Sequence, residues 1–148
     1  MNADSPEIDE VRTLFQNRVP AVASGVVAIR GIVREPGNRT ILAVASTDPA
    51  TDAVGSCVGL RGAVIKDIVA QIHREFIDIV LWNDSPKKFL SNLFAPVRFR
   101  TTSFDEASHQ ATAVLKAGSE QAVSKNFPLK ARLFRNLTGW VLQLMTES

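Results

Sequence analysis

The residues best suited to chemistry are two glycines, Gly59 and Gly62, with Arg61 between them and Lys66 shortly afterwards. Glycine has no Cβ, so a pair at this spacing lets the backbone turn tightly and lets a phosphate approach the amides of a following helix. The Arg61 guanidinium suits a phosphate, and Lys66 lies one turn later on the exposed face. The spacing therefore predicts an anion-binding turn, and the alternative is an ordinary helix-turn-helix corner with solvated cations.

The elements that position this turn are two helices and a strand. Residues 52–58 are predicted to end one helix, and residues 63–72 are predicted to form the next. The second helix carries one apolar stripe, which indicates packing against a sheet: Val64, Ile65, Ile68, Val69 and Ile72. Residues 76–82 then read as a strand.

The chain before the glycine turn is predicted to hold a helix and a hairpin. Residues 5–16 have Ser5 as N-cap and Pro6 at the first helical position. Residues 25–33 and 40–46 are rich in β-branched residues and flank a turn that contains Pro36 and Gly37. The predicted order is therefore α-β-β-α-α-β.

The same order repeats in the second half. A capping turn precedes a helix over residues 87–94, strands are predicted over residues 97–104 and 110–115, and helices over residues 118–124 and 129–137 precede a strand over residues 140–145. No flexible Gly/Ser linker separates the halves, which predicts one rigidly packed tandem α+β unit. The expected domains are an acidic lead and helix over residues 1–18, a first domain over 19–94 and a second over 95–148.

Composition excludes several functional classes. Without the four acidic residues of the first ten, 17 basic residues face 11 acidic ones, a net charge of +6 that suits attraction to RNA or is simply a solvated basic surface. Cys57 is expected to be a small buried residue, and His73 and His109 are too far apart to form a metal cluster. No membrane span, targeting peptide, cofactor motif or catalytic constellation is found, so we expect a cytoplasmic protein that is not an enzyme.

Helix, GxxG loop, helix and strand together resemble a KH module, and longer sequence segments resemble the tandem KH region of the bacterial transcription factor NusA. These segments follow the family's order over roughly residues 11–145: Val19-Pro20 followed by Gly25, Val33-Arg34-Glu35-Pro36-Gly37-Asn38-Arg39-Thr40, Val54-Gly55-Ser56-Cys57-Val58-Gly59, Ile77-Asp78-Ile79-Val80-Leu81-Trp82 and Leu137-Thr138-Gly139-Trp140. The resemblance implies two type II KH domains that hold single-stranded RNA and influence pausing, termination and antitermination. Full-length bacterial members carry further domains, so the chain is either a piece of a longer protein or a short paralogue.

The expected RNA contacts follow from the resemblance and the charges. In the first module they are Gly59, Leu60, Arg61, Gly62 and Lys66. In the second module Lys125-Asn126-Phe127-Pro128 replaces the glycine loop, with Asn126 as a candidate helix cap, so the first module is expected to carry most of the contact. Basic residues nearby are expected to hold phosphates or to form a solvated helix face: Lys125, Lys130, Arg132 and Arg135.

Two questions about the second module remain open: what Phe127 and Phe134 contact, and whether the module binds RNA or a protein. Phe127 and Phe134 are expected to pack in the core rather than to meet a base or a protein. The alternative to RNA binding is a protein-interaction module on the same scaffold, which docks on RNA polymerase or a ribosomal component.

Overall fold

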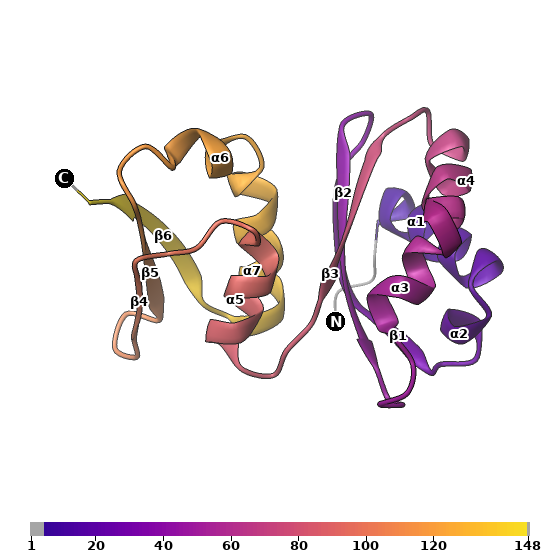
Figure 1. The fold of residues 1–148 in the computed structure, drawn as a ribbon, viewed down its shortest axis with the longest axis horizontal. Coiled ribbons are helices and arrows are strands. Elements are labelled where there is room, and N and C mark those ends of the chain that lie inside the picture. The colour runs from indigo at the N-terminus through magenta and orange to yellow at the C-terminus, as the bar shows by residue number, and fades with distance from the viewer. Residues whose placement is uncertain (1–4, 148) are drawn as a thin grey trace. The chain divides into compact units, whose positions relative to one another are not determined.

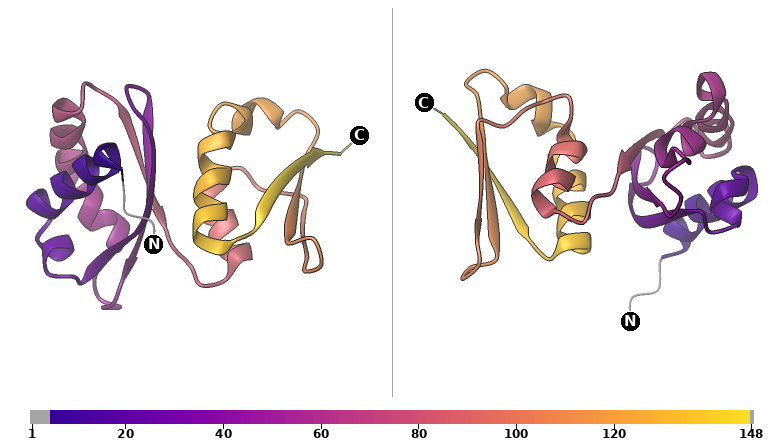
Figure 2. Two further views of the ribbon diagram at one scale, coloured as in Figure 1. Left: turned by 180° about the vertical axis from the view of Figure 1, so that it is seen from behind. Right: turned by 60° about the horizontal axis from the view of Figure 1, so that its bottom comes forward.

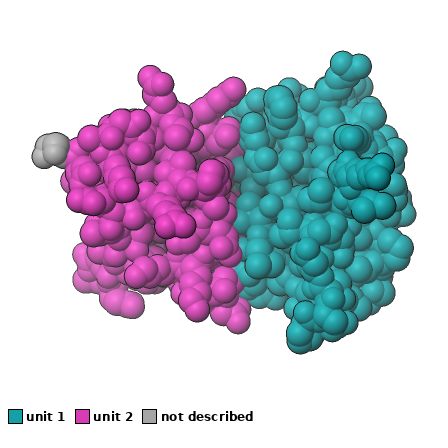
Figure 3. All heavy atoms as spheres, viewed as in Figure 1, with its two compact units in different colours: residues 1–82 teal, residues 83–148 magenta. Residues whose placement is uncertain are grey.

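The computed structural model describes residues 5–147, and these form two compact units that divide after Trp82 (Figures 1 and 3). Residues 1–4, where the acidic lead begins, lie outside the described residues. Each unit is a layer of helices on a three-stranded sheet, so the α+β class and the repeated order are confirmed. Among the described residues, no helix is both long enough and apolar enough to cross a membrane.

The first unit has the predicted elements, with one added helical turn, α2. Helix α1 begins as expected, because the Ser5 hydroxyl accepts a hydrogen bond from the Ile8 N–H at 3.4 Å and Pro6 occupies the first turn. The bounds are α1 (Pro6–Arg18), α2 (Pro20–Ala23), β1 (Val27–Glu35), β2 (Arg39–Ser46), α3 (Ala53–Val58), a 3-10 turn (Leu60–Gly62), α4 (Ala63–Gln71) and β3 (Phe76–Leu81).

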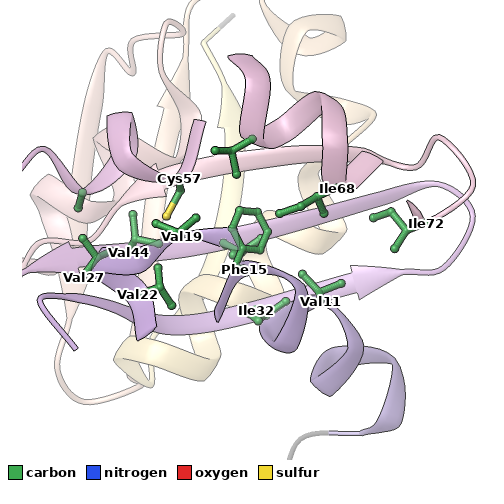
Figure 4. Packing of buried hydrophobic residues seen from close by; sticks show 13 residues of the cluster. Val11, Phe15, Val19, Val22, Val27, Ile32, Val44, Cys57, Ile68 and Ile72 are labelled. Carbon is green, nitrogen blue, oxygen red and sulfur yellow. The ribbon is translucent and has the colours of Figure 1, made fainter. Parts of the chain in front are cut away.

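The sheet of this unit has the order β1-β2-β3, with β2 antiparallel to β1 and parallel to β3. Leu42 pairs with Ile32 on one side and with Ile79 on the other. The helices cover one face of the sheet (Figure 2). Between them lies the core, in which Phe15 of α1, Val44 of β2 and Ile68 of α4 are fully buried (Figure 4).

A buried carboxylate, Glu75, fixes the turn between α4 and β3. Arg34 donates to it from Nε and Nη2 at 3.0 Å, the Gly37 N–H donates at 3.0 Å, and the Thr40 hydroxyl also donates. Burial alone would raise the pKa of Glu75, but these hydrogen bonds outweigh it and lower the pKa. Residues 34–40 therefore hold the hairpin turn to the end of α4.

The second unit repeats the topology, with sheet order β4-β5-β6 and β5 parallel to β6. Phe89 of the first helix stacks on Phe134 at 6.2 Å between ring centroids, and both are fully buried. The bounds are α5 (Pro86–Phe94), β4 (Thr101–Asp105), β5 (Gln110–Leu115), α6 (Glu120–Ser124), α7 (Phe127–Thr138) and β6 (Val141–Thr146).

Two boundaries differ from the sequence expectation. The compact units divide after Trp82, whereas the sequence placed the division after Phe94, because the apolar face of α5 packs against α7 of the second unit. The first strand of the second hairpin begins at Thr101 rather than at Val97, and residues 97–100 are not strand.

Candidate nucleic-acid interface

The glycine turn of the first unit is built from three residues with positive φ. Asp52 caps helix α3, because its carboxylate accepts a hydrogen bond from the Gly55 N–H at 2.9 Å, and the helix ends at Val58. Gly59 then takes φ 82° and ψ 166°, Arg61 takes φ 55° and ψ 28°, and Gly62 takes φ 74°. Because an arginine is strained in the left-handed region, the turn holds Arg61 at a cost of about 1–2 kcal/mol.

The two glycines serve different physical purposes. A Cβ on Gly59 would lie 2.6 Å from Val64 Cγ2 and 2.8 Å from the Val64 backbone nitrogen, so this glycine lets the turn close onto α4. A Cβ on Gly62 would meet only Lys66 Cε, at 3.8 Å. The sequence assigned both glycines to the approach of a phosphate, whereas this geometry gives Gly59 a packing role and leaves open space at Gly62.

The side chains of the turn are displayed to solvent. Leu60 is 85% exposed, and Arg61 and Lys66 are exposed without an ion-pair partner among residues 5–147. The contact with Gly62 places the Lys66 stem beside the turn, while the adjacent Asp67 pairs with Arg18 at 3.1 Å. The turn thus brings its five predicted residues together, with two cations and one apolar tip.

The backbone amides at the start of α4 add to this positive site. No side chain within the described residues caps α4, whereas Ser5, Asp52 and Ser85 cap α1, α3 and α5. An uncapped helix start keeps N–H groups for an anion, and the helix dipole favours negative charge there. Arg61, Lys66 and these amides can together hold a phosphate.

An apolar edge lies in the same unit. β3 is an edge strand against which α3 packs, and Leu81 near its end is 46% exposed. Side chains alternate between the two faces of a sheet along a strand. Leu81 therefore lies on the same face as Ile77 and Ile79, which pack against the helices. An apolar side chain there offers contact to a base.

The corresponding corner of the second unit lacks this geometry. Between Gly118 and Gly139, no described residue has positive φ, and Pro128 in the first turn of α7 removes one N–H. Asn126 stands at the N-cap position, but its side chain makes no capping hydrogen bond, so the predicted cap is not formed. Phe127 is half-buried, with its ring centroid 6.3 Å from that of Phe94. This corner is therefore a packed bend rather than an open turn.

The four predicted cations of the second unit do not form one cluster. Lys130 is half-buried, and its Nζ lies 5.1 Å from the Phe94 ring centroid. Arg132 and Arg135 are exposed and about 60° apart around α7, roughly opposite Lys130. Lys125 is exposed at the end of α6. Only Arg132 and Arg135 share a helix face.

An apolar groove of about 640 Å³ lies beside this corner. Its lining residues come from the α6–α7 corner, the end of β5 and the edge strand β6. They include one acidic residue and no basic residue. They are Leu115, Glu120, Val123, Ser124, Phe127, Pro128, Leu142, Gln143, Leu144, Met145 and Thr146. Such a lining suits an apolar ligand better than a phosphate.

Two observations concern metal ligands and the cysteine thiol. Within residues 5–147, no group of three or more His, Cys, Asp or Glu side chains could hold a metal ion. Cys57 is fully buried, as predicted, and burial raises the pKa of its thiol to about 11, so it is not a poised nucleophile.

Known proteins resemble this chain over most of its length. Residues 5–82 match the family described as "NusA-like first KH domain". The chain is 33% identical over 137 residues to the transcription termination/antitermination protein NusA of Rickettsia conorii and 34% identical to that of Rickettsia prowazekii. Each alignment covers 90% of this chain and 27% of the relative, so the chain spans about a quarter of their length.

A solved structure described as "Crystal structure of APE1850" has the same fold. It superposes with a TM-score of 0.66 and covers 97% of this chain and 100% of that one, at 17% identity. At this identity the likeness shows the fold alone.

Proposed function

Because this chain belongs to the family of NusA-like KH domains, we propose that it binds single-stranded RNA in the control of transcription elongation, termination or antitermination. The observation that carries the proposal is the turn at residues 59–62, which exposes Leu60 and Arg61 over an uncapped helix start. The RNA backbone would cross the turn, with one phosphate on the α4 amides between Arg61 and Lys66. The role is binding, without catalysis.

The first module carries most of this contact. Its turn keeps open space at Gly62, whereas the second corner is closed by Phe127 and loses a donor at Pro128. Arg132 and Arg135 share an exposed face, and Lys125 and Lys130 lie elsewhere on the unit. These four cations would extend the site by attracting phosphates without reading bases.

The backbone conformation of Arg61 allows its charge to be tested apart from the fold. Asparagine adopts the left-handed region more readily than arginine does, so Arg61→Asn removes the charge without straining the turn.

Fluorescence anisotropy of a labelled single-stranded RNA library tests the proposal. Wild type is expected to bind, with log affinity falling by about 0.7 per log unit of salt for each phosphate neutralised. Leu60→Asp/Arg61→Asp is expected to abolish binding, and Arg61→Asn is expected to reduce both the affinity and the salt slope. Unchanged affinity in the folded double variant would refute the turn as the RNA site.

A second candidate function is protein docking through the second module. The apolar groove beside the α6–α7 corner favours protein docking, because no basic residue lines the groove. It lies against the edge strand β6, where Met145 is 58% exposed. RNA polymerase or a ribosomal component is the partner proposed. A nuclease-treated pull-down tests it: a partner that survives nuclease and is lost with Phe127→Asp supports docking, whereas recovery of RNA alone argues against it.

A further inference from the structure

A second concave site in the second unit shares no lining residue with the apolar groove. It is a groove of about 570 Å³ between α5 and the segment that leads into β4. Lys87, Ser91 and Ala95 line one wall, four residues apart on one face of α5. The other wall is residues 96–102. We call it the α5 groove.

The charge of the α5 groove is strongly positive. Lys87, Arg98 and Arg100 are among its lining residues, and no acid is among them. Glu147 pairs with Arg100 at 3.0 Å, in a bridge whose side chains are 56% and 36% exposed. Lys87 and Arg98 have no ionic partner within residues 5–147. The carboxyl end of α5 contributes only about half a negative charge, which the cations outweigh.

The α5 groove also offers neutral donors. Ser91, Thr101 and Thr102 contribute hydroxyls to its lining. The Thr102 hydroxyl oxygen is the one buried side-chain polar atom without a hydrogen-bond partner in the described part of the chain. This hydroxyl is shielded from solvent, so the neutral donors open to a ligand in the groove are those of the exposed residues Ser91 and Thr101.

Aromatic packing connects this groove with a cation already proposed to attract RNA. Phe99 lines the groove and packs edge-on against Phe94, at 5.4 Å between centroids. Lys130 Nζ lies 5.1 Å from the centre of the same Phe94 ring. The groove wall and Lys130 therefore contact the same buried side chain, Phe94.

We infer that the α5 groove binds a backbone phosphate of single-stranded RNA, held by Lys87 and Arg98 and by the groove hydroxyls. The inference rests on the proposed function, because it adds a second contact to the same RNA. Arginine forks and compact ammonium groups are the side chains that proteins use for phosphates, and the lining has no carboxylate to repel one. Sequence reasoning passed over this site because Arg98 and Arg100 lie outside any motif, and because Lys87 approaches them only through the fold.

The test compares two double variants of the full chain that remove the same charge. Lys87→Ala/Arg98→Ala changes the α5 groove and leaves the Arg100 bridge intact. Lys88→Ala/Lys116→Ala changes two exposed lysines outside it. RNA affinity is measured for both variants and for wild type at 50 mM and 200 mM salt.

The expected result is a specific change in salt dependence. Loss of one phosphate contact lowers the salt slope by about 0.7, so the fourfold rise in salt weakens the groove variant about 2.6-fold less than wild type. The control variant is expected to keep a slope closer to that of wild type. Ser91→Ala is expected to weaken binding without changing the slope, because it removes a neutral donor.

Three outcomes would overturn the inference, and each is recognisable. Equal slopes for the two double variants, while Leu60→Asp/Arg61→Asp still abolishes binding, would refute the α5 groove alone. No binding by wild type would refute the proposed function as well. Inorganic phosphate that shifts the Arg98 and Thr102 amide resonances, with RNA affinity unaltered by the groove variant, would assign the groove to small phosphorylated compounds.

Discussion

Replacing each glycine of the 59–62 turn by alanine tests whether the two glycines differ as the geometry indicates. Gly59→Ala places a methyl group 2.6 Å from Val64 Cγ2 and 2.8 Å from the Val64 backbone nitrogen. The backbone nitrogen can move only if α4 moves. Gly62→Ala places a methyl group 3.8 Å from the flexible end of Lys66, which is ordinary contact.

The magnitudes follow from overlap and from backbone conformation. At Gly59 the overlap costs about 1–3 kcal/mol and the φ/ψ region, which is almost restricted to glycine, costs about 1–3 kcal/mol more. At Gly62 only the left-handed conformation counts, at about 1–2 kcal/mol. Central values of about 4 and about 1.5 kcal/mol differ by about 2.5 kcal/mol, or about seventyfold in an opening equilibrium.

Hydrogen exchange followed by mass spectrometry measures this difference within the intact chain. Peptides from β2, the central strand of the first unit, report its opening, and peptides from β5 report that of the second unit. In Gly59→Ala the β2 amides are expected to exchange about seventyfold faster than in Gly62→Ala. The β5 amides serve as the internal control and are expected to change little.

Substitution by asparagine separates the cost of steric overlap from the cost of the backbone conformation. Gly62→Asn is expected to exchange more slowly than Gly62→Ala, since asparagine tolerates the left-handed region. Gly59→Asn is expected to gain nothing over Gly59→Ala, because ψ 166° lies outside that region and the contact with Val64 remains. Equal β2 exchange in the two alanine variants, or faster exchange in Gly62→Ala, would refute the assignment of Gly59 to packing.

Three further predictions concern the first unit. Glu75→Gln is expected to destabilise it by about 2–3 kcal/mol in urea unfolding, because Arg34 loses its buried carboxylate and keeps only Glu10, which is more exposed, as an ionic partner among the described residues. Since the folded-state pKa of Glu75 is lowered, its contribution is present above the unfolded pKa of about 4.3 and is lost as pH falls through the folded value, so wild type but not Glu75→Gln should lose this stability in acid. Native Cys57 is expected to resist alkylation at pH 8 and to react once urea unfolds the chain, and fast labelling of the native protein would contradict its burial. Arg61→Asn is expected to match or exceed wild type in β2 protection while it weakens RNA binding, and loss of protection would mean that the arginine serves the fold.

Much of the fold was predictable because its signals are local. Ser5 and Pro6 fixed the start of α1, and the turn around Pro36 and Gly37 fixed the first hairpin. A cap or a turn depends on residues within about four positions, which the sequence displays directly. The spacing of Gly59 and Gly62 likewise predicted the turn and its exposed side chains.

The prediction failed where a local signal depends on distant packing. Asn126 has the right type for a cap, but its side chain makes no capping bond at a corner where Phe127 packs against Phe94. The first domain was expected to reach Phe94, but the apolar face of α5 finds its partner on α7, about forty residues later. Neither contact can be read from neighbouring residues.

The sequence by itself determined the order of the elements, the place of the glycine turn, the loss of that turn in the second half and the membership in the NusA-like KH family. Tertiary structure decided what those residues do. It made Gly59 a contact for Val64, gathered Arg34, Gly37 and Thr40 around Glu75, and placed Lys87 and Arg98 in the lining of one groove. The physical reason is the distance along the sequence over which each effect acts. Secondary-structure propensity depends on residues within about one turn, whereas packing and charge act between segments that only the folded chain brings together.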